Sequence, residues 1–389
     1  MRAQKKSDKK VIVWAVTVLL SAVLLFAGNR IVSSHLNIMG DPDTAAKAKV
    51  TELGEFIEET TDGINFTART QYFYAKILSG PLKGKTVEAT QQIDSYTDTG
   101  ERFVKKGDKV VLYNYGAVYG TEELWVFGNY ARFGYIAVLG ILFLALLLVF
   151  GRGKGLNTII SLAYTCLAVF CVFVPGVLAG YNIYLLTILI CIFTIVMTLI
   201  LTNGTTAKSA ATMLGCGAGV LAAGVLSFLL DRIMHLTGFI DEHSVYLQVL
   251  GESSNPINLR ALIFAMITIG AMGAVMDVAM DIASSLYEVK RHAPSISDKE
   301  LFKSGMNIGR DVMGTMANTL VLAYIGSSLC TILLKITYAN SMLELLNTES
   351  MIVELLNAVL GSMAILLTIP LTALVCIALY RGRHSGHAR

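Results

Sequence analysis

Charged residues are scarce in this sequence. Asp, Glu, Lys and Arg make up 15% of the chain, whereas hydrophobic residues make up 54%. Soluble domains carry nearer a quarter charged residues, so a soluble protein is disfavoured even though 389 residues would hold two or three domains. The net charge of +3 is too small to indicate nucleic acid as a partner.

Cysteine patterns typical of metal sites or disulfides are also missing. No two cysteines have Cys-x-x-Cys spacing, and all of them lie in apolar runs, where thiols pack as small hydrophobic groups. The six cysteines are Cys166, Cys171, Cys191, Cys216, Cys330 and Cys376. We therefore expect no metal site and no cofactor.

Catalytic patterns are absent as well. There is no Walker A motif, so the sequence does not indicate ATP-driven chemistry. An intramembrane aspartyl protease needs a Gly-x-Gly-Asp sequence, which Gly273-Ala-Val-Met-Asp277 does not provide, although Asp311 on the next predicted span would supply a second acid. We expect a protein that is not an enzyme.

Long hydrophobic runs are present instead, and most of them reach the ~20 residues that cross a membrane as a helix. We predict an all-α polytopic bundle of about eight transmembrane helices. The first run follows a basic tail, residues 1–10, and lacks a small-x-small cleavage site, so it is typical of an uncleaved signal anchor. The seven later runs form a predicted membrane domain, residues 132–381. The predicted spans are residues 11–27, 133–150, 156–174, 183–201, 209–230, 261–286, 312–334 and 353–380.

Lysine and arginine set the predicted orientation of these spans. With the N-terminus inside, most basic residues fall in inside segments, and the short outside loops carry only Arg232, Arg260 and Lys335. Both ends, including the tail 382–389, are therefore predicted to be cytoplasmic. Another inside segment, residues 297–309, begins with a Ser297–Glu300 capping box and is predicted to be a short helix parallel to the membrane.

A polar segment, residues 28–131, separates the first two predicted spans. Residues 41–63 are predicted to be a linker with one short strand, and alternating residues between turns predict further strands after it. The predicted strands are residues 48–53, 68–78, 86–93, 110–115 and 124–127. They indicate a small extracytoplasmic β-barrel of OB-like type over about residues 48–127. Because it would face outward, we expect contact with a protein or polysaccharide, or a structural role, and no nucleic acid.

Two carboxylates interrupt the sixth predicted span. Asp277 and Asp281 lie one helical turn apart and share a face, and each costs roughly 2.5–3.5 kcal/mol to place in a membrane. Glu288 continues the stripe. A carboxylate pair held there can take up and release protons, which indicates a proton or cation relay. Alternatively, the helix leaves the bilayer early, because Asp277 lies about 24 Å from the helix start against a hydrocarbon core of about 30 Å.

The seventh predicted span carries a second polar stripe, which includes Asp311 and Asn318. Since lipid cannot satisfy polar groups, we expect the two stripes to face each other and form a path open to the cytoplasm. Small residues in the fifth and sixth spans indicate close helix packing. The expected packing glycines are Gly215, Gly219, Gly270 and Gly273.

Three stretches carry a family resemblance: Gly273-Ala-Val-Met-Asp-Val-Ala-Met-Asp-Ile-Ala-Ser-Ser-Leu286, Gly309-Arg-Asp-Val-Met-Gly-Thr-Met-Ala-Asn-Thr-Leu320 and Leu78-Ser-Gly-Pro-Leu-Lys-Gly84. They resemble the YibE/F family of bacterial membrane proteins, over about residues 48–381. The resemblance implies an architecture more than an activity. A more distant resemblance, in Gly273-x-x-x-Asp277 and the basic helix after it, is to resistance-nodulation-division permeases, and it implies that Asp277 is the proton-carrying acid.

These observations predict a multipass protein of the bacterial plasma membrane. The leading hypothesis is a proton- or ion-coupled permease for a small molecule or ion, with Asp277 as the main titrating group and Asp281 as its partner. Asp311 and Asn318 would be the facing ligands. The alternative is a non-catalytic scaffold or envelope-assembly factor whose outside barrel docks a partner. The bilayer is a partner in both cases, and a homo-oligomer or a second membrane protein fits both.

Overall fold

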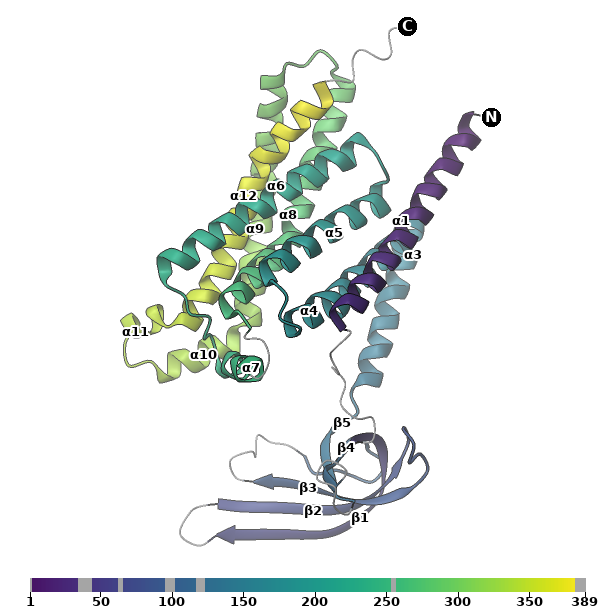
Figure 1. The fold of residues 1–389 in the computed structure, drawn as a ribbon, viewed down its shortest axis with the longest axis vertical. Coiled ribbons are helices and arrows are strands. Elements are labelled where there is room, and N and C mark those ends of the chain that lie inside the picture. The colour runs from purple at the N-terminus through teal and green to yellow at the C-terminus, as the bar shows by residue number, and fades with distance from the viewer. Residues whose placement is uncertain are drawn as a thin grey trace. The chain divides into compact units, whose positions relative to one another are not determined.

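A computed structural model describes residues 2–33, 44–61, 66–94, 102–116, 123–252 and 257–381. The predicted cytoplasmic tail 382–389 and the first residues of the predicted linker lie outside these ranges. The chain divides into two compact units, which are described separately (Figure 1). Residues 37–146 form one unit, and residues 1–36 with 147–389 form the other, called the helical unit below.

The first unit contains a closed five-stranded barrel, which confirms the predicted small β-barrel. Its strands follow the order β1-β2-β3-β5-β4, and β4 closes back onto β1. All neighbouring pairs are antiparallel except β3 and β5. The strands are β1 (Ala45–Thr61), β2 (Phe66–Ile77), β3 (Thr86–Asp94), β4 (Lys109–Asn114) and β5 (Trp125–Tyr130).

Strand β1 corrects the predicted linker. Instead of ending near residue 53, it pairs with β2 as far as Thr61, opposite Phe66. Glu55, Glu58 and Glu59 of this part are exposed, so composition indicated a linker, but its backbone groups gain ladder partners. Irregularities at Val50/Glu52 and Leu53/Phe56 interrupt the register of this long strand, and such bulges bend strands at barrel closures.

Side chains from all five strands fill the barrel. Phe73, Val110 and Leu112 are fully buried there, and Trp125 is 3% exposed. The turn before β4 uses Gly107 at φ 98°, a conformation that favours glycine. Alternating inward residues therefore build this core as the sequence pattern predicted.

The helical unit is built from long apolar helices. They are α1 (Arg2–Ser33), α3 (Phe133–Ala168), the π-helical turn η2 (Val169–Phe173), α4 (Val174–Leu178), α5 (Ile183–Asn203), α6 (Ala207–Met234), α7 (Glu242–Glu252), α8 (Leu259–His292), α9 (Asp298–Ser327), α10 (Leu329–Tyr338), α11 (Met342–Asn347) and α12 (Glu349–Arg381); the first residues of α3 belong to the barrel unit. Figure 1 shows α12 among α6, α8 and α9, and all three pack against it. These four helices position the candidate site.

Six helices in the described ranges are long and apolar enough to cross a membrane, and the bent pair α9–α10 would add a seventh. The prediction of eight spans further requires the 46-residue stretch 133–178 to cross twice. A break in α3 allows a turn, because Arg152 has φ 47° and ψ −127°. Beyond it, the α-carbon of Gly155 lies against the carbonyl of Leu147, a pair that an unbroken helix would hold about 12 Å apart.

Helix α9 corrects the predicted end of the inside helix. The Ser297–Glu300 capping box is confirmed, but the helix runs without interruption to Ser327 instead of ending at residue 309. The seventh predicted span, residues 312–334, is not one straight helix, since α10 departs from α9 at 61°. No proline or helix-ending glycine separates the two predicted segments, so backbone hydrogen bonding continues through Gly309.

Candidate functional site

Helix α8 has an apolar face and a polar face. Val275, Val278 and Ile282 lie on the buried face, against α6 and α12. Asp277 and Asp281 lie on the exposed flank, as the helical spacing predicted. Apolar packing of one face therefore fixes the rotation of α8 and leaves both carboxylates outside the core.

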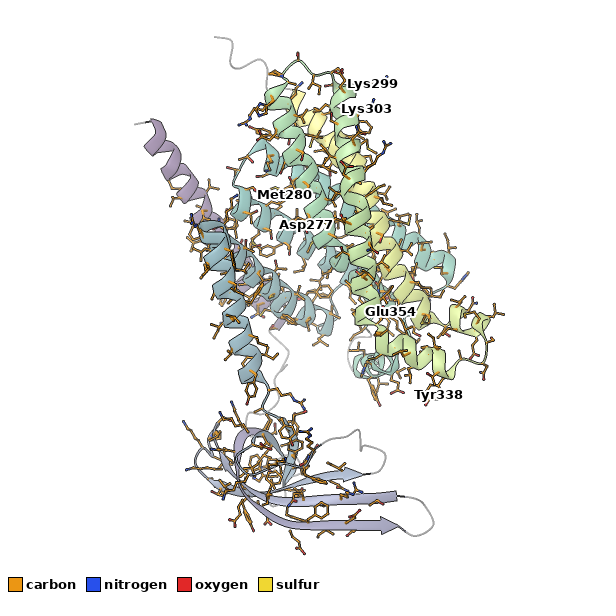
Figure 2. All side chains as sticks on the ribbon, turned by 180° about the vertical axis from the view of Figure 1, so that it is seen from behind. Asp277, Met280, Lys299, Lys303, Tyr338 and Glu354 are labelled. Atoms are coloured by element: carbon orange, nitrogen blue, oxygen red, sulfur yellow. The ribbon has the colours of Figure 1, made fainter. Side chains whose placement is uncertain are left out.

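Asp277 and Asp281 are exposed carboxylates without a partner among the described residues. Among the described residues, neither carboxylate forms a hydrogen bond or an ion pair, and their like charges act on each other. Figure 2 shows Asp277 between the end of the helical unit that carries Lys299 and the end that carries Glu354. Two unpartnered carboxylates partway along an apolar helix can bind protons or cations.

Glu288 does not belong with this pair. Its carboxylate lies 2.7 Å from a guanidinium nitrogen of Arg291, and both side chains are more than half exposed. The basic last turn of α8, with Lys290, Arg291 and His292, also suits the negative end of the helix dipole. Glu288 is therefore in a solvated ion pair at the helix end.

The polar stripes of α8 and α9 do not face each other, so that prediction is wrong. Asp311 and Asn318 are exposed on the outward face of α9, whereas Gly305 and Gly309 are buried on the opposite face. A Cβ at Gly309 would overlap Ile369 of α12. Close approach of α12 to the glycine face decides the rotation of α9, and Asp311 lies about 200° around the helix from Gly309.

Tyr324 is the polar residue of α9 that lies against the polar flank of α8, where Asp311 and Asn318 were expected. Its hydroxyl lies against Gly270, on the same flank of α8 as Asp277, and its ring lies over Gly361 of α12. The hydroxyl is buried and, in the part of the chain that the structure describes, has no hydrogen-bond partner. Glu354 of α12 is close enough for its charge to act on this hydroxyl. A polar group of α9 therefore does contact the α8 stripe, but near Gly270.

Helix α12 supplies three further polar side chains on one face, at i, i+4 and i+7: Ser350, Glu354 and Asn357. Ser350 is 1% exposed and Asn357 is 3% exposed, and an oxygen of each has no partner. Together with Tyr324 these residues are called the α9–α12 polar cluster below. The sequence interpretation missed them. Their spacing within an apolar run was the available signal.

The predicted packing glycines divide into two groups. A Cβ at Gly215 or Gly219 would overlap the hydroxyl of Thr372 or Thr368 of α12, so α6 and α12 approach closely there. Gly270 makes room for Tyr324 in the same way. Gly273 is exposed, and a Cβ there would meet nothing within 4 Å.

An apolar groove of about 410 Å³ lies on α5, α6 and α8. Cys191, Phe264 and Thr268 are among its lining residues, and the buried hydroxyl of Thr268 has no partner. Cys216 lies within electrostatic range of both Cys191 and Asp277, so the groove is near the α8 carboxylates. Within the described ranges, no three His, Cys, Asp or Glu side chains are grouped as metal ligands would be.

Comparison with known proteins gives one match. Residues 139–382 match the sequence profile of the YibE/F-like protein family. No curated protein and no solved structure matches the chain, and the resemblance to resistance-nodulation-division permeases is not among the findings. The matched residues include α8, α9, α12 and every candidate site residue, but not the β strands. The match and the long apolar helices support a multipass membrane protein. Since the match covers more than half of its length, the chain belongs to the YibE/F-like family.

Proposed function

We propose that the protein is a proton- or ion-coupled permease of the bacterial plasma membrane, with Asp277 as the main titrating group and Asp281 as its partner. The observation that carries the proposal is the pair of carboxylates on apolar helix α8 with no partner among the described residues. Ionisable residues inside a membrane are rare, and by default they indicate an ion or proton pathway. We assign the protein no enzymatic role.

The proposed relay uses the α9–α12 polar cluster instead of Asp311 and Asn318. From Asp277, about 10 Å of helix leads to Gly270, where the Tyr324 hydroxyl lies. Glu354 follows on α12. A gap of this size requires water between the groups, and the unpartnered oxygens of Tyr324 and Asn357 are suitable binding groups for it.

The apolar groove beside Cys191 is the proposed substrate site. Its volume falls within the ~300–1,000 Å³ of typical small-molecule sites. An apolar lining with the hydroxyl-bearing residues Tyr184 and Thr268 fits a mainly apolar molecule that carries a hydrogen-bonding group. Both termini would be cytoplasmic and the barrel extracytoplasmic, as the distribution of basic residues favours.

The test is proton flux into liposomes that contain the purified protein and an internal pH dye, under an imposed membrane potential. We expect Asp277→Asn to lower the flux at least ~10-fold, because the amide cannot take up a proton. Glu288→Gln is the matched control, since that carboxylate is solvated and paired with Arg291. Equal fluxes for wild type and Asp277→Asn would overturn the relay.

A scaffold or envelope-assembly factor is the second candidate. The compact barrel favours it, because its strand order and its parallel β3–β5 pair support an OB-like binding module. Deleting residues 67–127 separates the two functions. A scaffold would lose its partner in a pull-down, whereas a permease would retain flux through the helical unit.

A further inference from the structure

The outward face of α9 presents exposed polar groups, among them Asp311, Thr315 and Asn318. We call Asp311, Gly314, Thr315, Asn318 and Leu322 the α9 outer face; all five are exposed. Of the described helices, α8, α10 and α12 make substantial contact with α9, and α8 and α12 pack on its other side. The side chains of Asp311 and Asn318 have no hydrogen-bond or ion-pair partner in the described part of the chain.

Exposure of the Asn318 amide to lipid would cost free energy because of the depth of this residue along α9. With the bend that follows Ser327 at the outer edge of the bilayer, Asn318 lies about 14 Å of helix inside that edge, close to half of a ~30 Å hydrocarbon core. Lipid offers no hydrogen-bond partner to an amide at that depth. Something other than lipid must therefore cover the α9 outer face.

We propose that a second copy of this chain covers it, with the α9 outer faces of two copies packed together about a twofold axis. Asn is self-complementary because its amide both donates and accepts, so Asn318 can pair with Asn318 of the second copy. Gly314 and Thr315 are small and allow the two helices to approach closely, as membrane helix pairs require.

Charge also fits a second copy. Arg310 and Asp311 are both exposed, but adjacent residues on a helix do not face each other, and no ion pair joins them. Across a twofold axis, Arg310 at the edge of one face reaches Asp311 of the second copy. Each α9 outer face therefore offers both a cation and an anion to the same face of the second copy. A contact about a twofold axis requires this self-complementarity.

Disulfide trapping tests the contact directly in membranes. In a full-length chain whose native cysteines are replaced by serine, Asn318→Cys should form a covalent dimer on mild oxidation, because residues on the axis bring their Cβ atoms close enough to be bridged. Leu189→Cys is the matched control, since Leu189 is 52% exposed on α5, away from α9. We expect at least ~10-fold more dimer from Asn318→Cys. Equal yields, or a disulfide to a different protein, would overturn the proposal.

A second measurement avoids added cysteines. Native mass spectrometry of the wild-type protein in nanodiscs should show dimers, Asn318→Leu should weaken them about 10-fold, and Asn318→Gln should retain them because it keeps the amide. Monomeric wild type, or Asn318→Leu dimers as stable as wild type, would contradict the contact. Both experiments measure assembly, so the result is independent of the proposed proton flux.

Discussion

Among the described residues, buried polar side chains have hydrogen-bond partners in the barrel, whereas several in the helical unit lack them. In the barrel, Gln71 donates to the carbonyls of Gly54, Glu55 and Tyr72, and Gln91 accepts from the amide of Val104 at 2.9 Å. In the helical unit, several buried side-chain oxygens have no partner. They belong to Thr194, Asp231, Thr268, Tyr324, Ser350, Asn357 and Thr372, and no barrel residue in the described ranges shares this condition.

The difference follows from the backbone. Barrel loops and bulges leave N–H and C=O groups outside the strand ladder, and glutamine side chains bond to them. Helices satisfy most of their own backbone groups. Some buried side chains share a helix carbonyl, as Thr187 does with Ile183, and the others need a second side chain, water or a ligand. A buried polar atom without a partner costs about 1–3 kcal/mol. The α9–α12 polar cluster gathers three of them, and this concentration supports a functional role.

Gly219→Leu should have the largest effect on stability. The new side chain would overlap Thr368 and Val275, so we expect a loss of about 3 kcal/mol, measured by thermal unfolding in detergent. Gly217→Leu is the control, because a Cβ there meets nothing within 4 Å. Equal losses would show that close approach of α6 and α12 does not stabilise the helical unit.

Gln91→Leu should destabilise the barrel by about 2 kcal/mol, because it leaves the buried N–H of Val104 unpaired. Trp125 fluorescence in a Trp14→Phe background reports barrel unfolding, since Trp125 lies in the barrel core. Gln92→Leu, at an exposed position on the same strand, should change little. If both variants unfold alike, the buried amide does not support the barrel.

Local patterns in the sequence predicted much of this architecture. Alternation and turns placed β2 and β3 within a few residues, because each inward side chain has a polar neighbour facing out. The capping box at Ser297 and Glu300 is also local: both hydrogen bonds join residues three apart. Such features depend on neighbours in the chain.

The arrangement of the site was harder to predict. Helix α9 carries Gly305 and Gly309 on one face and Asp311 and Asn318 on the other, and the sequence alone does not say which face α12 will cover. Keeping Asp311 away from lipid would favour the rotation of α9 that buries it. The observed rotation places Gly309 against Ile369, which lets α9 and α12 pack more closely. Tyr324 reaches Gly270 only after that rotation is chosen, so the α9–α12 polar cluster depends on tertiary packing.

Asn357→Leu contrasts with Gln91→Leu. Its buried oxygen has no partner, so an apolar side chain of similar size should change stability by less than about 1 kcal/mol, or raise it. Under the proposed relay, the same variant should still lower proton flux. The measurements are thermal unfolding and the liposome assay. A loss as large as that of Gln91→Leu would show that Asn357 has a stabilising partner and would remove the contrast between the two regions.

Glu123→Gln should have the smallest effect and depend on pH. Lys85 donates to the Glu123 carboxylate at 2.7 Å and holds the pKa of Glu123 below its ordinary value of 4.5. A lowered pKa stabilises the folded barrel above pH 4.5, and the contribution is lost as the pH falls through the folded value. Both side chains are nearly half exposed, so the contribution at neutral pH is about 0.2–1 kcal/mol. Trp125 fluorescence during urea unfolding should therefore separate wild type from Glu123→Gln at pH 7, and the difference should shrink as the pH falls below 4.5. Gln91→Leu, which removes a neutral amide, should lose the same stability throughout this pH range, and a pH-dependent loss there would contradict the assignment of the titrating contact to Glu123.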